Sequence, residues 1–215
     1  MKRIVTAAIF ALSLSPLAAY PADTGFATLV AGAVVFKDGA PLTVFTKLRS
    51  GDQLLLKPGA KLQLVYFASG RQETWGSPCN LSIGERESSA RECPDPGVKA
   101  LPPMVLSALL NTPDLITDIR NRSGMVRVRA FADQEQVAAD QAQYRSLREQ
   151  AAPDDITPEL YLFSRQWKFH LTSAMAETLA AMEQRQPNNP EVAALRAKYQ
   201  KLLDGMEKKA PNIGQ

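Results

Sequence analysis

The chain has 215 residues, of which 45% are hydrophobic and 22% are charged. This composition is that of an ordinary globular protein with a sizeable core, which makes disorder an unsuitable default. The chain carries 25 Lys and Arg residues against 22 Asp and Glu residues, so its net charge is small. A strong preference for nucleic acid or for an anionic membrane surface is therefore not indicated.

The first 22 residues have the form of a secretory signal peptide. Lys2 and Arg3 precede an apolar run over residues 4–14, and a Ser-Pro pair and small residues follow that run. The run is shorter than the about 20 apolar residues that a membrane-spanning helix needs. We therefore expect export, cleavage after Ala19 or Ala22 and no integral membrane segment afterwards; an uncleaved anchor is the alternative. Cleavage lowers the Lys and Arg count from 25 to 23 and leaves a nearly neutral chain.

Two cysteines, Cys79 and Cys93, are present. In an exported chain such a pair predicts a disulfide. The loop that it would close has about 15 residues, which corresponds to roughly 3 kcal/mol in the chain-entropy model. The rival interpretation is a metal site, but two thiolates and His170 would still lack a fourth ligand, and no C-x-x-C spacing occurs. No cofactor is implied.

Residues 24–83 predict a small antiparallel β-sandwich or barrel. Short runs of β-branched and aromatic residues alternate with turn signals. Asp38-Gly39 indicates a hairpin between residues 33–36 and 42–45, and Pro58-Gly59 suits a type II turn. The sequence "KLQLVYF" at residues 61–67 alternates in its first half, which predicts a strand half-buried there and apolar on both faces afterwards.

The turns of this region also follow a recognisable order. An L-x-x-G-D turn precedes a strand, a short turn, a long strand and a Ser-Gly turn. This succession resembles the FecR domain. The matching positions are Leu48, Gly51, Asp52, Leu54, Ala60, Leu62, Leu64, Phe67, Ser69 and Gly70.

The resemblance implies a bacterial periplasmic protein with an envelope protein as its partner. The family occurs in periplasmic regulators that relay signals to sigma factors, and in other envelope proteins. Those regulators carry a cytoplasmic helical segment and a membrane span ahead of the domain, whereas a signal peptide takes that place in this chain. Only the extracytoplasmic module is therefore expected to carry over, and the resemblance implies a signalling accessory.

Residues 98–153 predict a mixed connector. Prolines begin two expected short helices over residues 103–110 and 113–120. The sequence "MVRVR" at residues 125–129 alternates and predicts one more strand with an arginine face. Residues 134–150 are polar and permit a helix.

The last part, residues 154–215, predicts an antiparallel helical hairpin. Thr157-Pro158 indicates a capped helix start, and "PNNP" at residues 187–190 separates the expected first helix from a second one. The apolar positions that predict a continuous first helix follow 3-and-4 spacing: Leu160, Phe163, Trp167, Leu171, Ala174, Thr178 and Met182. The pair resembles one tetratricopeptide unit. A single unit cannot bury its own face, so it must pack on the β domain, on residues 134–150 or on another subunit.

We therefore expect an α+β fold in four segments: a signal peptide over residues 1–22, a FecR-like β domain with a disulfide-tied loop over 23–97, the connector over 98–153 and the helical hairpin over 154–215.

No assembled catalytic motif is found. His170 is the only histidine and lies among aromatic residues in the expected helix, which favours the edge of a core over a catalytic role. Glu85 with Glu87, and Asp154 with Asp155, are carboxylate pairs, and we interpret both pairs as solvated loops. A cryptic envelope hydrolase that uses Glu85 or Glu87 is the weakest of our functional hypotheses.

Binding is the favoured function. The best local basic group is Arg120, Arg122, Arg127 and Arg129, which we name as candidates for binding an anion or a partner. Trp75, Tyr66 and Phe67 are interpreted as core residues rather than as a binding platform. We expect a non-enzymatic, exported binding or scaffolding module. The alternative is a direct binder of an anionic envelope polymer such as peptidoglycan or lipopolysaccharide.

Overall fold

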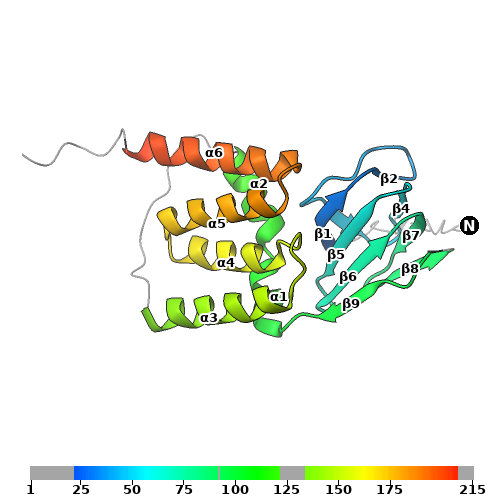
Figure 1. The fold of residues 1–215 in the computed structure, drawn as a ribbon, viewed down its shortest axis with the longest axis horizontal. Coiled ribbons are helices and arrows are strands. Elements are labelled where there is room, and N and C mark those ends of the chain that lie inside the picture. Colours follow the sequence, from blue (N-terminus) through cyan, green and yellow to red (C-terminus); the bar gives the residue numbers. More distant parts are fainter. Residues whose placement is uncertain (1–21, 92, 122–133, 208–215) are drawn as a thin grey trace, which may run out of the picture.

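The structure, a computed structural model, describes residues 22–91, 93–121 and 134–207. Residues 1–21 of the expected signal peptide and the strand expected over residues 125–129 lie outside this part of the chain. In Figure 1 helices form one side of the molecule, and two β-sheets form the other side. The fold is α+β.

The two antiparallel sheets face each other as a sandwich, with no closed barrel. The five-stranded sheet has the order β3 (Lys47–Arg49), β1 (Asp23–Ala31), β5 (Lys61–Tyr66), β6 (Arg71–Gly76) and β9 (Gly97–Ala100). The four-stranded sheet has the order β2 (Val34–Phe36), β4 (Gln53–Leu56), β7 (Cys79–Ile83) and β8 (Ser88–Arg91). β9 extends the larger sheet past residue 97, where we expected the β domain to end.

The two turns predicted from glycine are present. Gly39 has φ 88°, and the Phe36 amide donates to the Ala40 carbonyl at 2.8 Å across its turn. The returning arm of this hairpin is a single bridge between Val35 and Pro41 rather than the expected strand. Gly59 has φ 81° at the third position of its turn, a conformation that glycine adopts without steric cost.

The inner faces of the two sheets form the sandwich core. β5 is central, and Leu62, Leu64 and Tyr66 point from it into this core. Trp75 on β6 is buried beside them, and Phe67 stacks on Phe26 with ring centroids 5.7 Å apart. The interpretation as core residues is confirmed for Tyr66 and Trp75, whereas Phe67 is half-buried and packs against the cluster that the helices form.

Six helices follow the strands in the described chain. They are α1 (Pro103–Leu109), α2 (Thr112–Asn121), α3 (Gln134–Gln150), α4 (Thr157–Lys168), α5 (Thr172–Arg185) and α6 (Pro190–Glu207). In Figure 1, α3 to α6 lie side by side in sequence order, and α1 and α2 lie behind this layer. The predictions of two short proline-led helices and of a helix over residues 134–150 are confirmed. Asn189 caps α6, because its side-chain oxygen accepts a hydrogen bond from the Glu191 amide at 3.0 Å.

The single helix predicted from Thr157 to the "PNNP" turn is wrong. The chain breaks at Phe169–Leu171, where His170 adopts a left-handed φ of 54°, and α5 returns along α4. The 3-and-4 spacing of apolar residues continues through this break, so the sequence pattern did not indicate where the first helix ends. One helix over both segments would be about 44 Å long and would extend half of its apolar face beyond the core. Folding back lets α4 and α5 bury their apolar faces in the same cluster.

The helices cover the outward face of the five-stranded sheet. Phe26, Val65 and Phe45 from the β domain join the helical core cluster. The rest of this sheet face is polar, yet it is buried: Thr28 donates to the Gln63 side chain at 2.8 Å, and the Gln63 amide donates to Thr74 at 3.3 Å. The prediction that the first half of β5 is half-buried is therefore wrong, because helices lie where solvent was expected.

Asp155 joins the sheet to the helices and is not a solvated loop residue. Its side chain is 2% exposed. One carboxylate oxygen accepts from the Thr157 amide at 2.9 Å, and the other accepts from the Gln72 side chain at 3.1 Å. Asp155 therefore supplies the cap of α4 that we had assigned to Thr157. We call the boundary between the helices and the sandwich the seam. Elsewhere along the seam, the Gln186 side chain donates to the Thr28 carbonyl at 3.2 Å.

Asp155 and its neighbour Asp154 should differ sharply in their contribution to stability. Replacing Asp155 with Ala leaves the Thr157 amide and part of the Gln72 amide without an acceptor, so we expect a loss of about 2 kcal/mol in the free energy of unfolding. Asp154 pairs with Lys61 at the surface at 2.5 Å, and Asp154→Ala should cost less than about 1 kcal/mol. Urea denaturation measures both. Equal losses would contradict the buried position of Asp155.

The backbone at His170 makes a second test. A β-branched residue is strained in the left-handed region, whereas Asn tolerates it. His170→Val should therefore lower the free energy of unfolding by about 1–2 kcal/mol. His170→Asn is the matched control and should stay within about 0.5 kcal/mol of the wild type. If Val is tolerated as well as Asn, residue 170 does not sit in the turn between α4 and α5.

Candidate functional site

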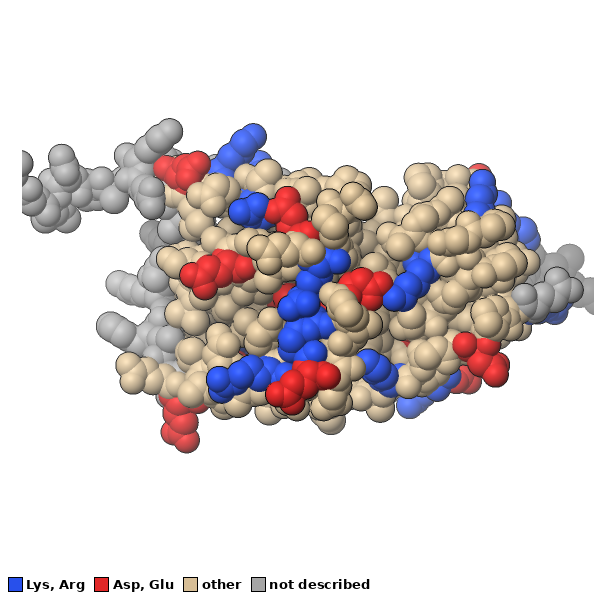
Figure 2. Space-filling view, in the orientation of Figure 1, with Lys and Arg blue, Asp and Glu red and all other residues tan. Residues whose placement is uncertain are grey.

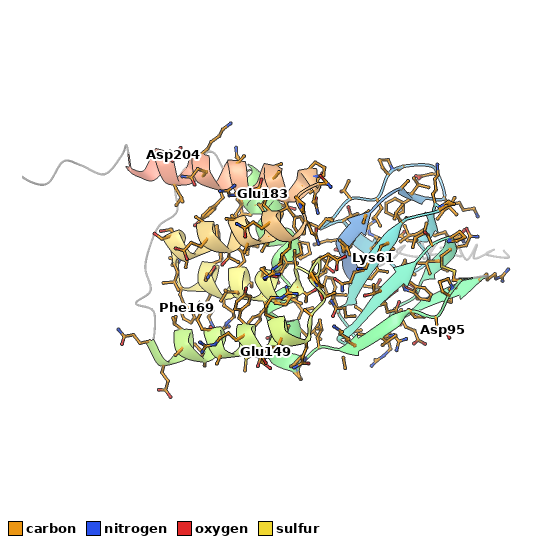
Figure 3. All side chains as sticks on the ribbon, viewed as in Figure 1. Lys61, Asp95, Glu149, Phe169, Glu183 and Asp204 are labelled. Atoms are coloured by element: carbon orange, nitrogen blue, oxygen red, sulfur yellow. A yellow bond between two sulfur atoms is a disulfide. The ribbon has the colours of Figure 1, made fainter. Side chains whose placement is uncertain are left out.

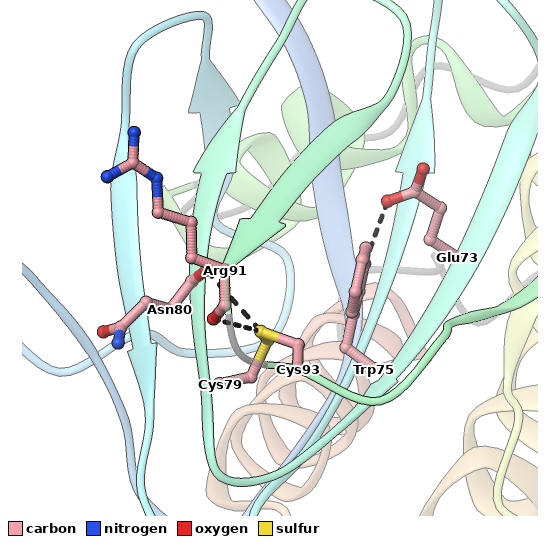
Figure 4. The surroundings of a disulfide bond; sticks show 6 residues. All are labelled: Glu73, Trp75, Cys79, Asn80, Arg91 and Cys93. Carbon is pink, nitrogen blue, oxygen red and sulfur yellow. Dashed lines mark hydrogen bonds between the residues drawn. A yellow bond between two sulfur atoms is a disulfide. The ribbon is translucent and has the colours of Figure 1, made fainter.

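The disulfide between Cys79 and Cys93 is confirmed. The two Cα atoms lie 4.8 Å apart, and the bond ties β7 to the segment that crosses from one sheet to the other toward β9 (Figure 4). Cys79 and Cys93 both pack against the sandwich core that contains Trp75. The bond is therefore part of the scaffold, and it spans 14 positions of sequence.

The basic candidates fall mostly outside the described chain. Arg122, Arg127 and Arg129 lie in residues 122–133 and are not described. Arg120 lies on α2, and its side chain is likewise not described.

The carboxylate candidates do not form a catalytic pair. Glu85 and Glu87 are exposed in the turn between β7 and β8, as a solvated loop should be. Asp154 is half-exposed and paired with Lys61. With Asp155 committed to the cap of α4, the two neighbouring aspartates have separate structural partners.

Two fully buried carboxylates were missed by the sequence interpretation. Glu73 on β6 accepts hydrogen bonds from the Arg71 side chain at 2.6 Å and from the Trp75 indole at 2.9 Å, as Figure 4 shows for Trp75. Both donors come from its own strand, at positions two residues away. Alternation along this strand places Glu73 on the same face as Trp75. Because Trp75 was interpreted as a core residue, this shared face was the sequence signal that Glu73 is buried.

Glu159 is the second buried carboxylate, and it lies at the first turn of α4. Its oxygens accept from Arg148 on α3 at 3.0 Å and from Arg185 on α5 at 2.7 Å. Tyr144 donates to it at 3.0 Å. Burial, followed by the charge of Glu159 and the hydrogen bond to it, raises the pKa of Tyr144. Because two arginines already satisfy this carboxylate, it joins three helices and has no free oxygen for chemistry.

Ion pairs continue along the seam between the helices and the sandwich. Figure 2 shows Lys and Arg side chains along this boundary with acidic side chains beside them, and Figure 3 places Lys61 at the junction. Arg148, Arg185 and Lys61 each have an acidic partner there. Each of these cations is therefore engaged in an ion pair within the seam.

His170 lies far from these groups. Figure 3 shows its neighbour Phe169 at the end of the helical layer that points away from the sandwich. His170 is half-buried beside Trp167, Met175 and Tyr199, around a cavity of about 10 Å³. No carboxylate lines this cavity, and the edge-of-core interpretation agrees with this position.

One unoccupied surface is the outward face of the four-stranded sheet. It forms a hollow of about 760 Å³, compared with about 450 and 570 Å³ for two grooves along the seam. Cross-strand pairing aligns one row over this face: Val35, Leu55, Asn80 and Arg91. Leu55 at its centre is 39% exposed. Figure 4 shows Asn80 and Arg91 extending away from the buried Trp75.

The charge of this hollow is one-sided. Lys37, Lys57 and Arg91 line it, and no acidic residue is among the described residues that line it. All three cations are exposed, and none forms an ion pair with the described residues 22–91, 93–121 and 134–207. The chain as a whole is nearly neutral, so this face is basic by placement and not by composition.

Among the residues that the structure describes, no group of three or more His, Cys, Asp and Glu side chains could hold a metal ion. No described helix is long and apolar enough to cross a membrane.

Comparisons with known proteins give no relative. No family model matches the chain, and no curated protein and no solved structure matches it. The resemblance to the FecR domain thus depends on the turns and strands over residues 48–70.

The disulfide should contribute measurably to stability. Reduction releases a loop of about 15 residues in the unfolded chain, so we expect a loss of about 3 kcal/mol in the free energy of unfolding. Urea denaturation with and without dithiothreitol measures this loss. A double variant, Cys79→Ala with Cys93→Ala, is the control and should not respond to the reductant. An unchanged midpoint of the wild type on reduction would show that the bond adds nothing.

Proposed function

We propose that this protein is an exported, non-enzymatic binding or scaffolding module of the bacterial cell envelope, and that it binds a partner protein through the outward face of its four-stranded sheet. The observation that carries the proposal is the open, one-sided face itself. An exposed Leu55 lies at the centre of a hollow of about 760 Å³, and three cations that form no ion pair with the described residues line it. Apolar surface with a polar rim is typical of interaction sites.

The way the carboxylates are used supports a binding role over a hydrolytic one. A glycosidase needs two carboxyl groups that flank the bond to be cleaved, with room for the substrate between them. Glu73, Glu159 and Asp155 are buried, and each is engaged by donors of the protein itself. Glu85 and Glu87 stand in an exposed turn and line none of the hollows described above.

The compartment is proposed from the signal sequence and the disulfide. Disulfides persist in oxidising compartments such as the periplasm. The three-part form of residues 1–22 agrees with export to that compartment. A signalling accessory role, as the FecR resemblance implies, is the finer form of this proposal.

Crosslinking in the native envelope tests the proposal. A photo-reactive amino acid at Leu55 should yield one defined protein adduct, identified by mass spectrometry. The same residue at Leu110, which is 41% exposed on the helical side, is the control and should not yield that adduct. A glycan adduct alone would favour the polymer-binding alternative. Turnover of an envelope glycan or peptide that survives purification would overturn the non-enzymatic assignment.

A further inference from the structure

We infer that the outward face of the four-stranded sheet recognises an extended acidic protein segment in which two carboxylates flank an apolar side chain, in the pattern acidic-x-apolar-x-acidic. This inference rests on the proposed function and specifies the chemistry of the partner.

The apolar centre of the site is the pair Val35 and Leu55. They are Cα partners on β2 and β4, and both line the hollow. Alternation places Leu55 outward, because Leu54 and Leu56 on the same strand point into the sandwich core. A partner gains from this surface by burying an apolar side chain on it. A protein segment supplies such a side chain, whereas a uronate polymer does not.

The two lysines flank this centre at opposite ends. The Lys37 amide donates to the Gln53 carbonyl at 2.9 Å, and the Lys57 amide donates to the Ala33 carbonyl at 3.0 Å. Lys37 therefore lies beside residue 53, and Lys57 lies at the other end of β4, with Leu55 midway. Residues 53 and 57 are four positions apart in an extended chain, so the two lysines are separated by about 13 Å along the strand direction.

This separation fits the repeat of an extended partner. Side chains on one face of an extended segment recur every second residue, at about 6.7 Å. A segment that lies along β4 can therefore place an apolar side chain over Leu55 and carboxylates, two residues away on either side, beside Lys37 and Lys57. Arg91 lies three strands across the same row from Val35 and adds positive potential at the β8 side.

The positions of the acidic residues in the structure also favour an acidic partner. At the seam, Lys61 pairs with Asp154, and Arg148 and Arg185 both pair with Glu159. Around the hollow, the residues that the structure describes include no such acidic partner. Opposite charge on an incoming segment is the complement that this face lacks.

Three labelled peptides of nine residues test the inference by fluorescence anisotropy with the purified protein. The first, GTETVTETG, carries the proposed spacing. The second, GTEEVTTTG, has the same composition with adjacent carboxylates. The third, GTKTVTKTG, reverses the charge. We expect the first to bind, the second to bind several-fold more weakly and the third not to bind. Binding of the first should also weaken as salt is raised.

Charge-reversal variants locate the site. Lys37→Glu with Lys57→Glu should weaken binding of the first peptide at least about tenfold, since each favourable pair is replaced by a repulsive one. Arg145→Glu with Lys201→Glu is the matched control on exposed positions of α3 and α6, and it should change affinity less than twofold. Thermal unfolding checks that both double variants are folded.

Three outcomes would overturn the inference. They are failure of the first peptide to bind at millimolar concentration, equal binding of all three peptides, and unchanged binding by the Lys37/Lys57 variant. Tighter binding of a polyuronate than of any peptide would assign the face to a polysaccharide and would also overturn it. If the Leu55 crosslink to a protein persists in the Lys37/Lys57 variant, this inference fails while the proposed function stands. If the wild type yields no protein adduct, the proposed function itself fails.

Discussion

The architecture depends on one constraint. The outward face of the five-stranded sheet is polar, and the helices bury it. Thr28, Gln63 and Gln72 point away from the sandwich core, where solvent-exposed side chains are ordinarily found. Covering them without partners would be costly, since each unsatisfied buried polar group loses its hydrogen bonds to water. Asp155 at the start of α4 and Gln186 at the end of α5 supply partners for this face. The helical layer can therefore lie directly on the sheet.

This arrangement gives the two faces of the sandwich different roles. One face is closed by helices, and the ion pairs of the seam hold it closed. The other face carries no described element, and it presents Leu55 and a set of exposed cations to solvent. The helical layer thus fixes the sheet as a rigid support, while the opposite side remains available.

Much of the β domain could be predicted from local signals. Gly39 and Gly59 sit in turns that need a positive φ, and the residue types around them indicated those turns. The cysteine pair predicted its bond because the first residues of the sequence led us to expect export, and an exported pair usually forms a disulfide. The helix after Thr157 was predicted at its start and was wrong in its length. No Gly or Pro marks the break at His170, and the choice to fold back depends on where the core lies.

The sequence by itself determined the turns, the alternation of the strands, the disulfide and the proline-led helix starts, because each depends on residues close in the chain. Only the tertiary structure decided which sheet face is covered. From the sequence Gln72 has the character of a surface residue, but it is buried and donates a hydrogen bond to Asp155, which lies 83 positions away. The same holds for the basic face: Lys37, Lys57 and Arg91 are scattered in the sequence, and strand pairing alone brings them around Leu55.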